Sequence, residues 1–572
     1  MIFYDFEVFS QDWLVVFKMP ISNQTTIIHN DRNQLLEFYQ NYQKELFIGF
    51  NNRGYDQYIF KGILLELNPY EISKYIIEGN KGWQFSNLFN RIIMNNFDAM
   101  TTRNGLKELE GFMGHEIKES SVSFDIDRPL NNEELEEIIK YCERDVSETI
   151  EIFKLRIKEF ESHLTLLKTF KLSLSNMSKT KAQLSAKILE ANKKVHNDEF
   201  ELNLPKNLLL GKYARVKDWF YDKINQNKEL ETELEELEGS EIYKQKLKIE
   251  IANVPHILGW GGIHGARVNY ATNGIIVNMD VSSYYPSLII NYDYLSRNAK
   301  PNKYKDFFDM QVKYKKENDF RSEPLKIVLN ATFGLSKYKY SALYDPLQAN
   351  NICIAGQLLL LDLIEKLENK WELLQSNTDG LIGKVQNMRD YNKLQIACAK
   401  WEERTKMKLK FDIYERIYQK DVNNYIIIDK SEKYKSKGSY LKTRHSLDND
   451  LPIVNKALIN FLLSNIPIEK TINECNELIM FQKVTKVSNK YSHIIYGNEI
   501  IHEKCIRTFA STKHEKGVWK LKIGKTTSDK IENTPKNCFI DNSNIIDKTI
   551  PEYLDKQWYI DLTNKRVKEF GK

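Results

Sequence analysis

The first third of the chain alternates apolar and polar residues with two different periods. The pattern predicts three strands and two helices, at residues 3–9, 13–17, 46–50, 31–42 and 131–153. Asp31 is a plausible N-cap of the first helix, and Asn131 or Asn132 of the second. We therefore expect an α/β unit at the N-terminus.

The rest of the chain is less regular. Residues 155–250 are mostly helical in pattern and highly charged, and the Glu/Lys stretch at 227–250, broken at Gly239-Ser240, predicts a solvated helical hairpin. Residues 255–265 are rich in glycine and predict a domain boundary. A mixture of strands and helices follows to about residue 430, and further helices and strands without a clear motif complete the chain.

Composition places the chain among folded proteins. With 572 residues, 42% hydrophobic and 12% aromatic, it is expected to form about three to five domains and not to be disordered. No apolar run reaches about 18 residues, so no membrane span is expected. The first residues do not resemble a signal peptide. The six cysteines form no CxxC pair, which favours free thiols in a reducing cytoplasm.

Charge is distributed unevenly. Residues 1–150 hold 14 Lys and Arg against 24 Asp and Glu, whereas residues 431–572 hold 25 against 17. A basic C-terminal two-thirds can neutralise phosphates, and an acidic N-terminal third can supply carboxylate ligands to metals. The alternative is that the solvent-exposed faces of these parts differ in the sign of their charge without any functional meaning.

Four acidic residues of the first third form a candidate metal site. Asp5 and Glu7 are two apart on a predicted strand, so both carboxylates point to one side. Asp56 follows a strand end, and Tyr141 and Asp145 share one helix face. Four acids holding two Mg²⁺ ions would suit phosphodiester hydrolysis, with Tyr141 orienting the attacking water. The alternative, a solvated strand edge, explains a single Asp-x-Glu better than the whole set.

A second pair of acids lies in the middle of the chain. Asp280 ends an apolar strand that turns into a helix, whose N-terminus is a ready anion site for a triphosphate. Lys326, Asn330 and Phe333 line one face of a predicted helix. Asp379 lies at a predicted hairpin tip, although Asn-Thr-Asp-Gly is also simply a good turn sequence.

These strings resemble the motifs of family B DNA polymerases of bacteriophage type. FYDFE at 3–7, NRGYD at 52–56 and YCERD at 141–145 resemble the three motifs of the 3′→5′ proofreading exonuclease. DVSSYYPS at 280–287, KIVLNATFG at 326–334 and SNTDG at 376–380 resemble polymerase motifs A, B and C. The order of six motifs is more specific than any one of them. Phe333, Ala331, Asn377 and Gly380 depart from the usual residues, and Asn377 replaces the first acid of motif C.

The resemblance implies roles for individual residues. Asp280, Asp379 and the backbone of Val281 would hold the metals of synthesis, and Asp5, Glu7, Asp56 and Asp145 those of degradation. Tyr285 would exclude a 2′-hydroxyl. The residues implied to bind nucleotide are Ser283, Tyr285, Arg321, Lys326, Asn330 and Phe333. Partial matches imply that DNA is bound by Asn52, Gly261, Gly262, Tyr425 and Lys437, with Lys435 and Lys442 nearby.

The implied fold is α/β and α+β multidomain, an RNase H-like exonuclease followed by a right-hand polymerase. The expected domains are the exonuclease (1–160), a helical linker or insertion (161–250), the palm (251–300 and 341–440), the fingers (301–340), and the thumb with the C-terminal region (441–572). Only 45 residues separate Asp280 from Lys326, which leaves no room for the long insertion of protein-primed polymerases. A nucleic-acid primer is therefore expected.

The expected cofactor is Mg²⁺, two per active site, with Mn²⁺ as a substitute. The expected partners are primer-template DNA and dNTPs, and a phage helicase, primase or single-strand-binding protein is a candidate. We expect a monomer in the cytoplasm of a bacterial host, encoded by a phage, without a membrane partner. Two alternatives stay open: an exonuclease whose polymerase half only binds DNA, and a non-catalytic replication scaffold.

Overall fold

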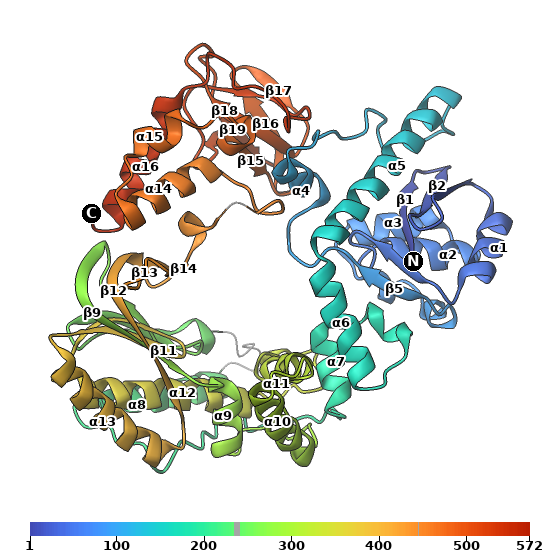
Figure 1. Ribbon diagram of the computed structural model, residues 1–572. Coiled ribbons are helices and arrows are strands. Elements are labelled where there is room, and N and C mark those ends of the chain that lie inside the picture. The colour runs from blue at the N-terminus through green and yellow to red at the C-terminus, as the bar shows by residue number, and fades with distance from the viewer. Residues whose placement is uncertain (234–240, 444) are drawn as a thin grey trace. The chain divides into compact units, whose positions relative to one another are not determined.

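The computed structural model describes residues 1–233, 241–443 and 445–572 (Figure 1). The chain forms two compact units. The first comprises Met1–Thr180, Thr443–Val454 and Glu469–Asp561, and the second comprises Lys181–Lys442, Asn455–Ile468 and Leu562–Lys572. Most of the C-terminal region thus belongs to the same unit as the N-terminus, a grouping that the sequence did not predict. The finer domain boundaries stay predictions.

A five-stranded mixed sheet organises the N-terminal part of the first unit. Its strand order is β3-β2-β1-β4-β5, with β1–β3 antiparallel and β4 and β5 parallel to β1. Its strands are β1 (Ile2–Val8), β2 (Trp13–Met19), β3 (Gln24–His29), β4 (Leu46–Gly49) and β5 (Asn95–Asp98). The helices of this part are α1 (Arg32–Tyr42), α2 (Asp56–Leu64), α3 (Pro69–Ile77), α4 (Leu106–Met113), α5 (Asn132–Leu155) and α6 (Ile157–Thr169). Asp31 and Asn131 are confirmed as N-caps of α1 and α5.

The two faces of β1 have different surroundings. Tyr4 and Phe6 lie in an aromatic core, where Phe60 of α2 packs against both rings. On the other face, Phe3 packs edge-on against Phe153 of α5, with ring centroids 5.3 Å apart. Because side chains alternate along a strand, Asp5 and Glu7 share the face of Phe3. Both acids therefore point away from the aromatic core and toward α5.

The C-terminal part of the first unit contains two antiparallel sheets, β15-β18-β21 and β17-β16-β19-β20. Their strands are β15 (Lys483–Lys486), β16 (Tyr491–Tyr496), β17 (Glu499–Ile501), β18 (Cys505–Ala510), β19 (Val518–Lys522), β20 (Ser528–Lys530) and β21 (Cys538–Ile540). Helix α4 packs on β15 through Leu109 and Val484. Buried Arg507 of β18 donates hydrogen bonds to the carbonyls of Gly111 (3.0 Å) and His115 (2.7 Å), at the end of α4. C-terminal strands thus hold α4 in place.

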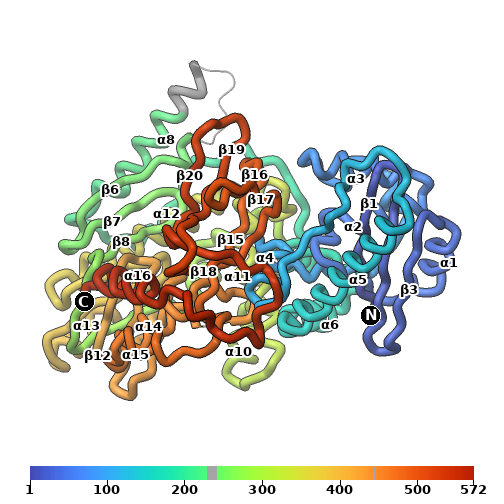
Figure 2. The backbone as a smooth tube through the Cα atoms, turned by 90° about the horizontal axis from the view of Figure 1, so that it is seen from above, coloured from blue at the N-terminus to red at the C-terminus, as the bar shows by residue number. Residues whose placement is uncertain are grey.

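The second unit is built on a nine-stranded sheet, ordered β14-β13-β12-β9-β11-β10-β8-β7-β6. Its strands are β6 (Lys246–Ile251), β7 (Val254–Gly259), β8 (His264–Ala266), β9 (Tyr270–Val281), β10 (Glu372–Asn377), β11 (Gly380–Val385), β12 (Leu409–Asp421), β13 (Asn424–Ile428) and β14 (Tyr434–Lys437). Figure 2 shows β6, β7 and β8 following one another across one side of this sheet.

The predicted helical hairpin at 227–250 is partly wrong. Its first arm coincides with the end of α8 (Arg215–Glu233), and its turn at Gly239-Ser240 lies outside the described residues. The expected second arm is instead strand β6, whose residues alternate between exposed and more buried positions. Alternation with a period of two is typical of a strand, and the many charged residues of this segment made the alternation hard to recognise in the sequence.

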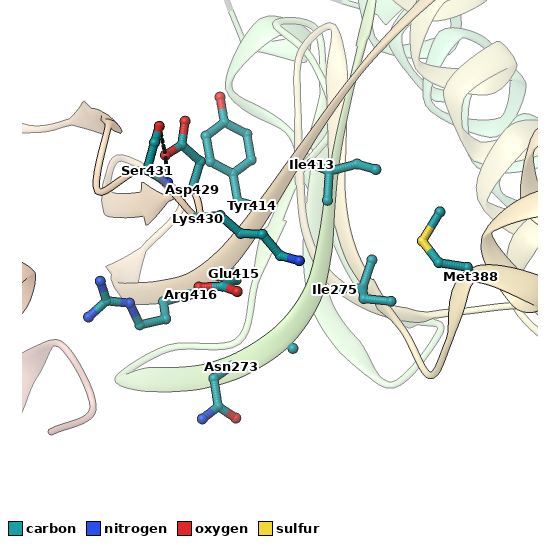
Figure 3. A pocket seen from close by; sticks show the side chains of 11 residues that line it. Asn273, Ile275, Met388, Ile413, Tyr414, Glu415, Arg416, Asp429, Lys430 and Ser431 are labelled. Carbon is teal, nitrogen blue, oxygen red and sulfur yellow. Dashed lines mark hydrogen bonds between the residues drawn. The ribbon is translucent and has the colours of Figure 1, made fainter.

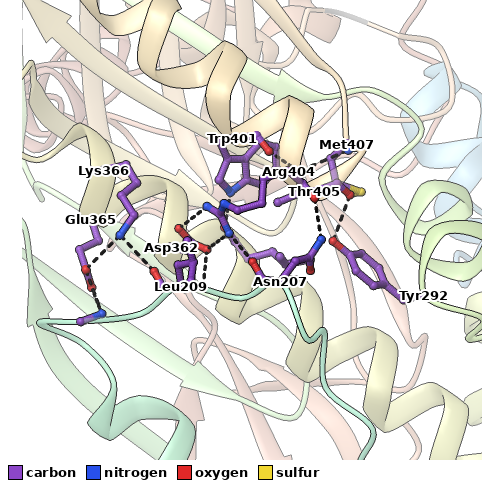
Figure 4. Close-up of polar contacts among 12 residues, drawn as sticks. Asn207, Leu209, Tyr292, Asp362, Glu365, Lys366, Trp401, Arg404, Thr405 and Met407 are labelled. Carbon is purple, nitrogen blue, oxygen red and sulfur yellow. Dashed lines mark hydrogen bonds and ion pairs between the residues drawn. The ribbon is translucent and has the colours of Figure 1, made fainter.

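Helices α12 (Pro346–Leu367) and α13 (Met388–Thr405) lie against the sheet of the second unit (Figure 1). Fully buried Asp362 of α12 accepts two hydrogen bonds from the guanidinium of Arg404 of α13, at 2.8 and 2.9 Å (Figure 4). The backbone N–H of Leu209 also donates to Asp362. A buried charge needs such partners, so this network fixes the two helices and the segment around Leu209 relative to one another.

Among the described residues, α12 is the one helix that is long and apolar enough to span a membrane. However, 94% of its most apolar window is buried within the protein. The remaining helices are α7 (Lys181–Ile188), α9 (Tyr284–Asn291), α10 (Pro301–Lys316), α11 (Ser322–Lys337), α14 (Pro452–Ser464), α15 (Ile468–Asn473) and α16 (Lys556–Glu569). Of these, α10 and α11 form a hairpin that packs on α7 and α12.

Candidate active sites

Asp5, Glu7, Asp56 and Asp145 come together in the first unit, around the middle of β1. Asp56 is the first residue of α2, and its carboxylate accepts a hydrogen bond from the backbone N–H of Phe6 at 3.1 Å. Asp145 comes from α5, where Tyr141 lies one turn earlier and bonds to it. These four acids and Tyr141, predicted as one set from the sequence, therefore share one buried cluster.

Burial and mutual repulsion disfavour the ionised form of the carboxylates in this cluster. Burial raises the pKa of Asp5 well above its usual range, and the charges of Asp56 and Glu7 raise it further. Burial raises the pKa of Glu7 likewise, and that of Asp56 to about 7. Buried like charges are stable only when something positive joins them. The set therefore fits divalent cations, which carboxylate oxygens bind well.

Two further residues of this cluster were missed from the sequence. Lys107 of α4 places its Nζ 2.7 Å from Asp145 Oδ1 and 3.0 Å from Glu110 Oε1, and 4.7 Å from the centre of the Tyr141 ring. Glu110 is fully buried, and burial raises its pKa to about 7. The segment that carries both residues showed no motif, so nothing local in the sequence pointed to them.

Asn52 does not fit its expected contact with DNA. Its side chain is 0% exposed, and its Nδ2 donates to Asn96 Oδ1 (2.9 Å) and to the carbonyl of Phe97 (3.0 Å). The amide thus ties the loop after β4 to strand β5. A side chain enclosed in this way supports the loop that carries Asp56 and does not face a ligand.

Asp280 and Asp379 meet in the second unit. Asp280 lies near the end of β9 and pairs in register with Gly380, the residue after Asp379. The backbone N–H of Val281 donates to the carbonyl of Asp379 at 2.8 Å. Burial and the charge of Asp280 raise the pKa of Asp379. Two acids that repel each other at a strand end fit a shared divalent cation.

There is no room for a side chain at Gly380. A Cβ atom at this position would lie 2.4 Å from Asp280 Oδ1, far inside contact distance. Asn377 has a local role, because its Oδ1 accepts a hydrogen bond from the N–H of Thr378 at 2.9 Å. The Asn377 amide therefore stabilises the turn that carries Asp379.

Several cationic and polar groups surround the two acids. Asp280 Oδ2 lies 2.9 Å from Asn278 Nδ2 and 3.2 Å from Lys435 Nζ. Tyr425 and Lys437 face each other in register on β13 and β14, and the charge of Lys437 lowers the pKa of Asp379. The sequence predicted Tyr425 and Lys437 as DNA contacts. Lys437 is exposed, whereas Tyr425 is only 7% exposed and packs in a core cluster with Ile417 and Ile427.

The two linker glycines have different surroundings. Gly262 is buried, and a Cβ there would lie 3.5 Å from the side chain of Thr378 in the carboxylate turn. Gly261 is exposed, with no atom within 4 Å of the position that its Cβ would take. The linker therefore passes next to Asp379 and leaves its backbone open at Gly261.

An aromatic pair lies beside the acids. Half-buried Tyr285 of α9 stacks on Phe333 of α11, with ring centroids 4.1 Å apart and planes at 18°. Tyr284, by contrast, is buried against α12 and is an ordinary core aromatic. Ser283 precedes α9 in a left-handed conformation, φ +49°, and is exposed. Tyr284 thus belongs to the core, and Tyr285 stacks on Phe333.

Helix α11 presents a polar face. Lys326 and Asn330 are exposed on it, and Lys326 pairs with Glu323 at 3.5 Å. Arg321 is occupied elsewhere, by Asp319 and by the ring of Tyr314. Lys326 and Asn330 are thus open to solvent, and Lys326 and Arg321 would each leave an acidic neighbour to meet a ligand.

One residue at the end of α11 was missed from the sequence. Lys337 Nζ lies 3.2 Å from the carbonyl of Trp260, 2.7 Å from Cys353 Sγ and 4.6 Å from the centre of the Phe333 ring. Lys337 thus ties the linker before Gly261 to the helix that carries Phe333.

A cavity of about 920 Å³ lies away from these residues, against β9 and β12. Figure 3 shows Ile275, Ile413 and Met388 on one side of it and the Asp429–Ser431 turn on the other. None of the predicted site residues lines it. The carboxylate pairs therefore define the candidate sites, and this cavity does not.

Comparison with known proteins gives three findings. No protein-family profile matches the chain. Over 73 residues, or 13% of its length, it is 34% identical to the uncharacterized mitochondrial protein ymf34 of Marchantia polymorpha, of which it covers 95%. A solved family B DNA polymerase of Pyrobaculum calidifontis is 12% identical, with 99% of this chain and 77% of that chain covered. The TM-score of 0.41 does not establish a shared fold.

Proposed function

Over those 73 residues the chain belongs to the family of a plant protein whose name assigns no activity, so we propose a function from its own two carboxylate sites. We propose that it is a template-directed DNA polymerase with a 3′→5′ proofreading exonuclease. One observation carries the proposal. Asp280 and Asp379, from motif-like strings far apart in the sequence, lie on paired strand ends beside the stacked rings of Tyr285 and Phe333.

For synthesis, Asp280, Asp379 and the backbone of Val281 would hold Mg²⁺, or Mn²⁺ in its place. The ions would supply activation of the primer 3′-hydroxyl and neutralisation of the leaving pyrophosphate. Lys326 binds the triphosphate as a point charge, and Phe333 packs on the new base pair. Tyr285, held by its stack on Phe333, blocks a ribose 2′-hydroxyl. Tyr425 and Lys437 position the primer end.

For degradation, Asp5, Glu7, Asp56 and Asp145 would hold Mg²⁺, and the ion would supply a lowered pKa for the attacking water. Tyr141 orients the attacking water, and its bond to Asp145 fixes the direction of its hydroxyl. The mixed sheet with acids on its central strand supports an RNase H-like domain. The C-terminal sheets hold α4, and with it Lys107 and Glu110, against this site.

The remaining parts of the proposal come from the resemblance. These are a nucleic-acid primer, a phage origin, action in a bacterial cytoplasm as a monomer, and cooperation with a helicase, primase or single-strand-binding protein. The 45 residues between Asp280 and Lys326 support the nucleic-acid primer, since α9 and α10 use most of them.

A primer-extension assay of the purified protein tests the proposal. With a 5′-labelled primer on a longer template and Mg²⁺, we expect extension when all four dNTPs are present and shortening when they are absent. Shortening alone would favour an exonuclease whose second unit only binds DNA. No turnover in either condition would favour a non-catalytic scaffold.

A further inference from the structure

Cys142 belongs to the carboxylate cluster of the first unit. It follows Tyr141 on α5, is 0% exposed, and its Sγ lies 3.4 Å from the carbonyl oxygen of Asp5 and 3.8 Å from Asp5 Oδ2. One ligand atom each from Asp5, Glu7 and Cys142 lies within 4.8 Å of the other two. A thiol therefore stands beside the two acids of β1, a feature that Mg²⁺ does not require.

Glu7 gives a second, independent indication of a ligand at this place. Its side chain is 8% exposed, yet its carboxylate accepts no hydrogen bond from the described residues. Lys107 forms its ion pairs with Asp145 and Glu110, and its charge favours the ionised form of Glu7, but burial outweighs it and the pKa of Glu7 stays raised. A buried carboxylate without a hydrogen-bond donor is costly, and a bound cation removes that cost.

The three groups match the needs of a thiophilic divalent cation. Zn²⁺ binds thiolate at about 2.3 Å and carboxylate at about 2.0–2.2 Å, which places ligand atoms about 3.5 Å apart in a tetrahedron. The side chains would need to close by about 1 Å to reach that spacing. Three protein ligands leave the fourth position for water, and the thiol proton leaves to solvent when the metal binds.

We propose that Asp5, Glu7 and Cys142 form a site for a thiophilic divalent cation such as Zn²⁺ or Cd²⁺. Such an ion uses the same two carboxylates as Mg²⁺, so the two kinds of ion compete. On the proposed function, the thiophilic ion arrests degradation and leaves synthesis in the second unit running. The cation content of the solution then sets the balance between the two activities.

Cadmium titration of the whole, metal-free protein tests the site directly. Thiolate-to-cadmium charge transfer adds an ultraviolet absorption band at shorter wavelength than the main aromatic band, and we expect this band to saturate at one ion per chain. Cys142→Ser retains a donor of similar size but lacks the sulfur, so the band should disappear. Cys538→Ser is the matched control, because Cys538 is also buried but lies beside Lys530 and no acid; it should retain the band.

Two further measurements keep the test decisive. Glu7→Gln leaves the thiol in place and removes one ligand. Mutation of a residue that only supports a metal ligand weakens binding about 10–100-fold, so Glu7→Gln should weaken cadmium binding at least as much. Excess Mg²⁺ should weaken it as well. A band of full size in Cys142→Ser, or no band in the wild type, overturns the proposal.

Activity distinguishes this proposal from the proposed function on which it rests. We expect Zn²⁺ to stop degradation by the wild type and to need about 10–100-fold higher concentration in Cys142→Ser. If the wild type degrades no DNA, the proposed function fails while the cadmium band still decides the site. Equal zinc sensitivity of the two proteins would contradict the competition.

Discussion

Lys107 Nζ lies 2.7 Å from Asp145 Oδ1, inside a cluster that holds four other buried or partly buried acids. The same ammonium lies 3.0 Å from fully buried Glu110. Among the described residues it is the one cation with ion pairs to both acids, and it lies over the ring of Tyr141. The protein thus places its own positive charge where the candidate metal site accumulates negative charge.

Replacing Lys107 should therefore destabilise the protein at neutral pH. Lys107→Met leaves Asp145 without its ion pair and Glu110 with Arg144 alone, at 3.5 Å. Loss of one member of a buried pair costs about 3–5 kcal/mol. Urea unfolding in EDTA at pH 8 measures this loss. Adding Glu110→Gln to Lys107→Met should recover part of it. A double variant no more stable than the single one would show that Lys107 does not act through Glu110.

Stability of the metal-free protein should fall as pH rises from about 4 to 7. Asp56 and Glu110 have folded pKa values of about 7, above the unfolded values near 4, so the folded state binds these protons more tightly. Their favourable contribution is complete below the unfolded pKa and is lost as pH passes the folded pKa. Thermal unfolding in EDTA at pH 5 and pH 8 measures this difference.

Mg²⁺ should reverse that trend. It binds the charged carboxylates, so it should raise the melting temperature more at pH 8 than at pH 5. An Asp5→Asn/Glu7→Gln variant, which has fewer acids to charge, should show a shallower pH dependence and a smaller response to Mg²⁺. Equal responses of the variant and the wild type would argue against a metal site at β1.

Gly380→Ala should abolish synthesis and spare degradation. The added Cβ would lie 2.4 Å from Asp280 Oδ1, so the carboxylate must move away from Asp379. Primer extension with dNTPs and shortening without them measure both activities in the same preparation. Because Gly380 lies in the second unit, unchanged degradation serves as the control for folding. Normal synthesis by this variant would mean that the position of Asp280 is not critical.

Arg507→Lys should reduce degradation several-fold more than synthesis. The guanidinium holds the end of α4 through hydrogen bonds to Gly111 and His115. A lysine ammonium lacks the planar, multi-donor geometry that makes these bonds. Helix α4 carries Lys107 and Glu110, so its displacement disturbs the carboxylate cluster. Lys516→Ala, at a partly exposed position of the same C-terminal part, is the control. Equal loss of both activities would indicate general unfolding.

The sequence predicted the local features of both sites because they follow from short-range periodicity. The period of two along β1 was enough to place Asp5 and Glu7 on one face. The Asn131 cap and the turn at Asp379 are likewise determined by neighbouring residues. Strand β6 was mistaken for a helix because charge was given more weight than alternation.

The sequence could not reveal the contacts that depend on distant segments. Lys107 reaches Asp145 across 38 positions, and Arg507 reaches Gly111 across 396. No pattern near Arg507 distinguishes it from a surface residue, because its burial results from the packing of α4 against β15 and β18. Asn52 is the opposite example: its place in a motif-like string predicted a contact with DNA, but the fold buries its side chain.

The central claim is that two separate carboxylate sites perform two separate reactions, and one paired measurement tests it. Asp379→Asn and Asp5→Ala/Glu7→Ala are compared on the same labelled primer-template with Mg²⁺, each with and without dNTPs. We predict that Asp379→Asn loses extension and still shortens the primer, and that Asp5→Ala/Glu7→Ala loses shortening and still extends it. Loss of both activities in either folded variant, or of neither, would contradict the account.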